Sequence, residues 1–179
     1  MASGSICSTR RHPGAHRVAA LLLKSLPNRA SNERMMRDVA VRIGLAFLPF
    51  DAAGPEDYPA AFAAMRAAGA EALVIEANPI FYRDATQLAA LALEGGLPTV
   101  CEWADMAQSG CLLGYGPSRT ELRRRNGEQI ARIFRGAAPG DLPIETATRF
   151  DFALNARTAK ALGITIPPSI LARADEVIE

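Results

Sequence analysis

Short apolar runs alternate along the chain with longer segments in which apolar residues recur at helical spacing. Residues 31–43, 58–68 and 83–93 carry apolar positions three or four residues apart, which predicts amphipathic helices. Strands that alternate with helices are typical of βαβ units, so the sequence predicts an α/β fold: a three-layer α/β/α arrangement around a mostly parallel sheet. The apolar runs that predict its strands are residues 18–23, 45–50, 71–76, 97–101 and 111–113.

The last third of the chain follows a different pattern. Gly114-Tyr-Gly-Pro117 is expected to break the fifth strand, and residues 102–109 before it form a short helix or turn. Ser118 is then a good residue to cap a long polar helix. The elements expected after it are a helix at 119–134, a linker at 136–143, an extended segment at 144–154 and short helices at 156–162 and 169–177.

Composition and charge exclude several classes of protein. Of 179 residues, 49% are hydrophobic and 22% are charged, as in ordinary globular domains with a substantial core. With 20 basic and 19 acidic residues the net charge is +1, which gives no bulk attraction to nucleic acid or to an anionic membrane. No apolar run approaches the roughly 20 residues of a membrane span. We therefore expect no nucleic acid partner and no membrane insertion.

Residues 1–16 are small, polar and basic, and we expect them to form a poorly ordered lead-in. The apolar run at 18–23 follows three arginines, as in a signal peptide. It is shorter than the roughly 7–15 apolar residues of such a peptide, and no A-x-A cleavage site follows it. The run is therefore interpreted as a buried strand.

Motifs for catalysis are missing from the sequence. It has neither the phosphate loop G-x-x-x-x-G-K-[ST] nor G-x-G-x-x-G after its first predicted strand. His12 and His16, the two histidines, lie in the predicted lead-in, which argues against a histidine base. Asp51, Glu76 and Glu102 lie at strand ends, where solvated or hydrogen-bonded carboxylates are a simpler interpretation than an acid–base pair. We expect no enzyme activity, no cofactor and no metal.

The three cysteines allow two interpretations. An odd number excludes a fully paired set of disulfides within the chain, and no spacing suits zinc. Cys101 and Cys111 lie in apolar surroundings, where the first interpretation is core packing. The alternative is a disulfide between them in an oxidising compartment.

Ligands of parallel sheets bind beyond the carboxyl ends of the strands. Trp103, the only tryptophan, either stacks on a ligand there or packs in the core. Tyr115 lies between two glycines, so its ring is expected to face a cleft or another lobe. The cluster Arg123-Arg124-Arg125 forms either a solvated face or a docking patch. The segments at these strand ends are 24–28, 50–54, 77–81, 102–103 and 115–118.

Several motifs together resemble one family. Gly114-Tyr-Gly116 is similar to its S-Y-G segment, with glycine in place of serine, and residues 55–65 also resemble it. The tail motifs are Asp141-Leu-Pro-Ile-Glu145, Thr148-Arg-Phe150, Leu154-Asn155, Thr158-Ala-Lys-Ala-Leu-Gly163, Ile166-Pro-Pro-Ser169 and the closing residues 171–179. On these motifs, residues 17–179 resemble the C-terminal lobe and tail of the ABC-transporter substrate-binding proteins, which have the type I periplasmic-binding-protein fold.

The resemblance implies two α/β lobes that close over a small ligand, which an ABC permease then receives. Relatives are associated with amino acids, often aromatic ones, or with similar small organic molecules. Since only the second lobe is matched, we divide the chain into a lead-in at 1–16, an α/β ligand-binding lobe at 17–143 and a C-terminal crossover tail at 144–179. The family implies a periplasmic location; without a convincing signal peptide, the chain as written is expected to be cytoplasmic.

The expected function is a solute-binding component of an ABC transporter, or a truncated remnant of one, that recognises a small organic ligand without catalysis. A separate partner is expected to supply the first lobe, or a second copy to form a homodimer. One alternative is a single lobe that has lost its ligand and dimerises through Tyr115, the 123–125 region and the tail; another is a small flavodoxin-like enzyme. The positions that match the family's cleft are Asn78, Pro79, Phe81, Trp103, Tyr115 and Gly116.

Overall fold

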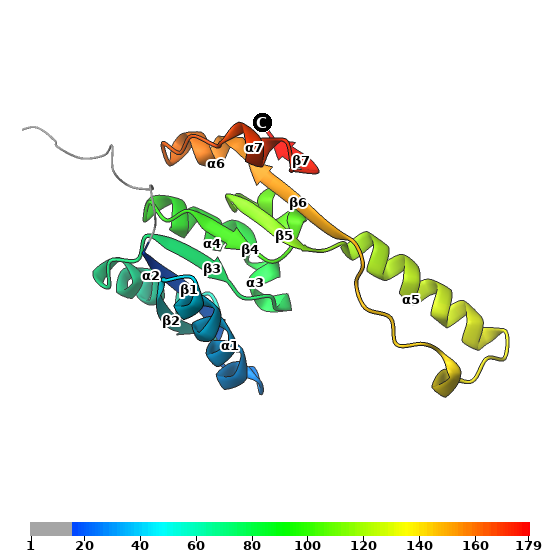
Figure 1. Ribbon diagram of the computed structural model, residues 1–179. Coiled ribbons are helices and arrows are strands. Elements are labelled where there is room, and N and C mark those ends of the chain that lie inside the picture. Colours follow the sequence, from blue (N-terminus) through cyan, green and yellow to red (C-terminus); the bar gives the residue numbers. More distant parts are fainter. Residues whose placement is uncertain (1–15) are drawn as a thin grey trace, which may run out of the picture.

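The computed structural model describes residues 16–179, and within this range seven strands form one sheet in the order β2-β1-β3-β4-β5-β6-β7 (Figure 1). All neighbouring strands are parallel except β5 and β6, which are antiparallel. This is the mostly parallel sheet that the sequence predicts. The strands are β1 Arg17–Leu23, β2 Ala46–Ala52, β3 Ala72–Ile75, β4 Thr99–Cys101, β5 Leu113–Pro117, β6 Phe150–Asn155 and β7 Glu176–Ile178.

Most helices follow the predicted positions. The helix expected at 83–93 corresponds to α4. A short helix that was not predicted, α3, precedes it, and the side chain of Asn78 caps α3 by accepting a hydrogen bond from the N–H of Phe81. The α-helices are α1 Arg29–Arg42, α2 Tyr58–Ala67, α3 Pro79–Arg83, α4 Ala85–Glu94, α5 Arg119–Phe134, α6 Ala156–Ala161 and α7 Pro168–Leu171, and the 3-10 helices are η1 Ala104–Ala107 and η2 Pro139–Asp141.

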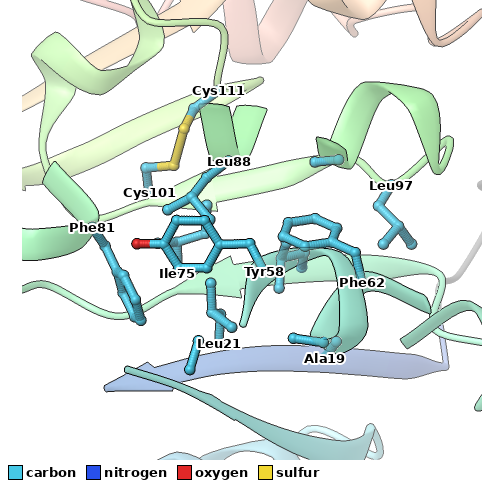
Figure 2. Close-up of a cluster of buried hydrophobic side chains, with 14 of the residues drawn as sticks. Ala19, Leu21, Tyr58, Phe62, Ile75, Phe81, Leu88, Leu97, Cys101 and Cys111 are labelled. Atoms are coloured by element: carbon cyan, nitrogen blue, oxygen red, sulfur yellow. A yellow bond between two sulfur atoms is a disulfide. The ribbon is translucent and has the colours of Figure 1, made fainter. Parts of the chain in front are cut away.

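Alternation along β1 separates the layers of the lobe. Ala19, Leu21 and Leu23 lie in the core cluster with side chains of α2 and α4, among them Tyr58 and Leu88 (Figure 2). Because successive side chains of a strand point to opposite faces, the buried residues 20 and 22 lie on the other face, against which α1 packs. The helices therefore cover both faces of the sheet, as the three-layer prediction requires.

Helix α1 covers its face of the sheet incompletely. Its apolar residues are at helical spacing, yet Met35, Val39 and Ile43 remain exposed, and Ala40 is its one buried residue. Val100 in β4, on the same side of the sheet as α1, is exposed too. A strip of apolar surface therefore continues from α1 across the neighbouring strands.

The glycine-rich segment expected to break the fifth strand is instead part of it, since β5 runs to Pro117. The two glycines are needed for a close approach of the chain segment after β4. A Cβ on Gly116 would lie 1.7 Å from the carbonyl oxygen of Glu102, and one on Gly114 would lie 2.5 Å from that of Trp103. Here glycine permits packing of backbone against backbone, where the sequence pattern suggested a turn.

The last predicted helix is also shorter than expected. Helix α7 ends at Leu171, and β7 pairs with the edge of β6. The sequence cannot show this edge, because β6 becomes available only after it has paired with β5. Among the described residues, no helix is both long and apolar enough to span a membrane.

The tail packs on its own lobe. Asn155, at the end of β6, donates its side-chain amide to the carbonyl oxygen of Ala107 at 2.8 Å and caps α6 by accepting from the N–H of Thr158 at 2.9 Å. Helix α5 behaves differently: it extends away from the sheet, and none of its residues is buried (Figure 1).

Cys101 and Cys111 form a disulfide, which is the alternative interpretation of their sequence context (Figure 2). Both residues are also fully buried in the core cluster, so the packing interpretation holds as well. The bond joins the end of β4 to the segment before β5. It thereby closes the loop that carries Glu102 and Trp103.

Candidate functional site

A pocket of about 440 Å³ lies beyond the carboxyl ends of β3 and β4, on the side of the sheet that α1 partly covers. Parallel strands end at a common edge, where the loops that follow them leave space for a ligand. The pocket is therefore at the position expected for open α/β sheets. Its lining residues are Asn32, Met35 and Met36 from α1, Val74, Ile75, Glu76 and Ala77 from β3 and its end, Val100, Cys101 and Glu102 from β4 and its end, and Tyr115 from β5.

The register of the strands places the apolar floor of this pocket. Val74 pairs with Val100, and Val100 pairs with Leu113 on β5. Tyr115 is two residues beyond Leu113, so its side chain leaves the sheet on the same face as the two valines. The alternate residues, among them Cys101, point to the opposite face and join the core. One face of the sheet thus lines the pocket, and the other packs in the hydrophobic core.

Glu76 brings a carboxylate to the inner end of the pocket. It follows β3 directly and is only 7% exposed. Its Oε2 accepts from the backbone N–H of Leu23 at 2.8 Å, and its Oε1 accepts from Nδ2 of Asn32 at 2.7 Å. A buried carboxyl group is costly unless such donors satisfy its oxygens. These hydrogen bonds tie the ends of β1 and β3 to the first turns of α1.

Glu102 is the second carboxylate of the pocket and remains exposed at its mouth. Packing around the carboxyl group raises the pKa of Glu102, and the charge of Glu76 acts in the same direction. A hydrogen bond from the backbone of Ala77 lowers the pKa in part. Among the residues that the structure describes, none forms an ion pair with either carboxylate.

Asn78, Pro79 and Phe81 lie outside the pocket lining. The amide of Asn78 accepts from the N–H of Phe81 at 2.8 Å and donates to the carbonyl oxygen of Glu76 at 3.3 Å, so capping occupies it. Pro79 is exposed in the first turn of α3. The ring of Phe81 is fully buried and packs edge-on against Tyr58, 6.0 Å away (Figure 2).

Trp103 also lies outside the pocket lining, although it is next to Glu102 in the chain. Its ring centroid is 5.2 Å from that of Tyr82, and the guanidinium of Arg119 is 5.0 Å from it. Arg119 lies 4.0 Å over the ring of Tyr82 and donates to Asp105 Oδ2 at 2.7 Å. Trp103 therefore helps to hold the first turn of α5 against the segment around η1.

Tyr115 is the one sequence candidate whose side chain lines the pocket. It is 55% exposed, and its ring stacks on Phe150 at 5.8 Å. Gly116 is buried and contributes through the absence of a side chain. The six candidates are thus divided among the pocket, the core, the exposed start of α3 and the base of α5.

Sequence reasoning did not select the contribution of α1 to the pocket. Asn32, Met35 and Met36 are three and four residues apart, so they share one helical face, but nothing local shows that this face meets the end of β3. Glu76 was considered as a carboxylate without being selected. The sequence feature that could have identified Glu76 is a charged residue directly after a buried strand. No group of three or more potential metal ligands occurs within residues 16–179.

Of the comparisons with known proteins, one shows the family and another shows the fold. Residues 7–178 match the family described as ABC transporter substrate binding protein. No curated protein matches the chain. Solved structures show the fold: a conserved domain protein from Vibrio cholerae superposes with a TM-score of 0.83 at 21% identity, over 92% of this chain and 55% of the other.

Two further structures are similar. An ABC domain from Streptococcus pneumonia, in complex with L-Trp, superposes with a TM-score of 0.80 at 21% identity, over 92% of this chain and 57% of its own. A ligand-free, open substrate binding protein with adhesive properties from Clostridium difficile superposes with a TM-score of 0.69 at 17% identity. The superposition covers 93% of this chain and 55% of that protein. The α/β fold expected from the sequence is confirmed. The chain spans about half the length of these proteins.

Proposed function

Because the chain belongs to the family of ABC transporter substrate binding proteins, we propose that it binds a small organic molecule, without catalysis, for delivery to an ABC permease. The observation that carries this proposal is the pocket at the carboxyl ends of β3 and β4. Its floor of Val74, Val100 and Tyr115 suits the apolar body of a ligand, and its polar rim suits a functional group. The L-Trp complex of the Streptococcus pneumonia domain supports a ligand of amino acid size.

The six sequence candidates keep different roles in this proposal. Tyr115 contacts the ligand with its exposed ring. Asn78, Pro79 and Phe81 shape the loop after β3 that holds Glu76, and Gly116 admits the backbone of Glu102 beside β5. Trp103 supports the same region by packing against Tyr82 of α3. The ligand therefore contacts loops whose shape these residues determine.

An enclosed cleft needs a second surface over this open pocket. We propose that the lobe at 17–143 supplies one wall and that a first lobe, or a second copy, supplies the other. The disulfide between Cys101 and Cys111 supports a location outside the cytoplasm, since such bonds persist in oxidising compartments. We therefore propose the periplasmic or extracellular location that the family implies, which replaces the cytoplasmic expectation.

A thermal-shift screen against amino acids, amines and small carboxylates tests the binding function. A ligand that binds the folded state raises the melting temperature. We expect a shift with one chemical class, its loss in Tyr115→Ala, and its retention in Phe134→Ala. The control residue is an aromatic on α5 that is 87% exposed and lies outside the pocket lining. No shift across the whole panel would contradict binding.

The second candidate function is an interaction module, which the surface of α5 favours. Ile130, Ile133 and Phe134 are exposed on this helix. Two arginines of the 123–125 cluster are less available: Arg124 pairs with Glu121 and Glu128, and Arg125 also pairs with Glu121. A partner would therefore contact the apolar residues rather than the arginine cluster.

The mass of the chain in solution tests this second function. We expect an oligomer that Phe134→Asp dissociates, because a charge at the centre of an apolar interface opposes burial. Glu128→Gln, a change of a polar residue on the same helix, should leave the mass unchanged. A monomer at all concentrations, with or without Phe134→Asp, would exclude dimerisation through α5.

A further inference from the structure

The charged side chains that line the pocket are all acidic. It includes the carboxylates of Glu76 and Glu102 but no arginine, lysine or histidine. The amide of Asn32 is occupied, since it donates to Glu76. Arg29, one turn earlier on α1, donates to Asp51 at 2.6 Å and to Glu33 at 2.6 Å. A negatively charged ligand group would therefore find no cationic side chain in this wall, whereas a positive group would find two acceptors.

Neither Glu76 nor Glu102 forms an ion pair with a described residue, and the two carboxylates differ in their hydrogen bonds and packing. Both oxygens of Glu76 accept hydrogen bonds, from the N–H of Leu23 and from Nδ2 of Asn32. Glu102 accepts one hydrogen bond, from the backbone of Ala77, and packing and the charge of Glu76 both raise its pKa. A cation between the two groups would offset this unfavourable interaction and would favour the charged form of Glu102.

The remaining lining suits the body of an organic cation. Met35 and Met36 offer polarisable thioethers, and Val74 and Val100 form the apolar floor. The exposed ring of Tyr115 offers a π-face, which attracts an ammonium group or packs against a second ring. The pocket of about 440 Å³ has room for a molecule the size of an arylalkylamine.

We propose that the ligand is an organic amine cation whose ammonium group binds between Glu76 and Glu102 while its apolar body lies on Val74, Val100 and Tyr115. This inference rests on the proposed binding function and specifies its ligand class. It also separates this chain from a receptor for zwitterions, because this wall repels the carboxylate that an amino acid carries. The site itself is defined by the pocket and its place in the sheet, and the acidic pair decides only which ligands enter it.

Matched ligands with one common ring system test the charge preference. Tryptamine, L-tryptophan and indole-3-propionate share an indole and differ in charge, and hexylamine and hexanoate form an aliphatic pair. Calorimetric titration of the full 179-residue chain should give the order tryptamine, then L-tryptophan, then indole-3-propionate. Added salt should weaken tryptamine binding, since it screens the exposed carboxylate at the mouth of the pocket.

A substitution of one carboxylate tests the assignment of residues. Glu102→Gln keeps the shape of an exposed side chain, and we expect it to weaken tryptamine binding about tenfold or more. Glu56→Gln changes an exposed glutamate that does not line the pocket and should have no effect. Neither variant should unfold at a lower denaturant midpoint than the parent, which separates a binding defect from a folding defect.

The possible results distinguish this inference from the function on which it rests. If indole-3-propionate or L-tryptophan binds as tightly as tryptamine, and Glu102→Gln has no effect, the amine assignment is wrong while ligand binding stands. If neither these molecules nor the wider thermal-shift panel binds, the binding function fails, and the amine assignment fails with it. Preference for the amines, lost in Glu102→Gln alone, supports both.

Discussion

The disulfide between Cys101 and Cys111 gives the sharpest test of how the pocket wall is held. Replacing both cysteines by alanine opens a loop with a sequence separation of 10. In the chain-entropy description, closing a loop of this length restricts the unfolded state by an amount worth about 2.7 kcal/mol at 25 °C. For a domain of this size, that corresponds to a fall in melting temperature of about 5–11 °C.

Urea denaturation of Cys101→Ala/Cys111→Ala measures this loss. Trp103 is the only tryptophan and lies inside the closed loop, so its fluorescence reports on the loop itself. Circular dichroism reports on the whole sheet for comparison. Cys7→Ala is the control: it removes the third cysteine and leaves the pair intact.

Thiol titration provides an independent check. The denatured, unreduced chain should show one free thiol, and reduction should raise the number to three. Reduction should also shift the unfolding midpoint of Cys7→Ala toward that of the double variant. Equal midpoints for the double variant and Cys7→Ala, or three thiols before reduction, would refute the idea that this bond stabilises the loop.

Three further predictions follow from packing and charge. Gly116→Ala should lower the free energy of unfolding by at least about 3 kcal/mol in the same urea assay, since its Cβ would meet the carbonyl oxygen of Glu102. The control Gly127→Ala, in open space on α5, should be neutral or stabilising by up to about 1 kcal/mol. Leu88→Ala in the core should cost about 2–5 kcal/mol, and Ile144→Ala, at a residue 98% exposed, should change stability by less than about 0.5 kcal/mol. Because packing raises the pKa of Glu102 above 4.5, its unfolded value, its contribution to stability is complete below pH 4.5 and is lost as the pH rises through the raised pKa. The unfolding midpoint of Glu102→Gln should therefore exceed that of the parent at pH 7 and match it near pH 4; a parent that is equally stable at pH 7 would contradict this assignment.

Most of the repeating structure could be predicted from the sequence, because it depends on neighbours in the chain. The run at 18–23 corresponds to β1, and helical spacing located α1, α2 and α4 within a few residues. The resemblance in the tail motifs also led to the correct family. Local pattern was less reliable where a segment meets a distant one: the glycines around Tyr115 became part of a strand, and the end of the predicted last helix became β7.

The candidate site shows the same limit more clearly. The sequence located the strand ends that border the pocket, because parallel strands share a carboxyl edge. It could not show that Glu102 lines the pocket while Trp103 packs beside Arg119, or that capping occupies the amide of Asn78. Which side of a sheet a loop residue faces depends on the register and on the element packed behind it.

The sequence by itself determined the class of fold, the order of most strands and helices along the chain, and the family. These follow from periodicity and from short motifs, and both are local properties of the chain. Only the tertiary structure decided the pairing of Cys101 with Cys111, the addition of β6 and β7 to the sheet, and the meeting of α1 with Glu76. Each of these joins residues from different segments of the fold, and such contacts form only where several packed elements bring the two partners within bonding distance.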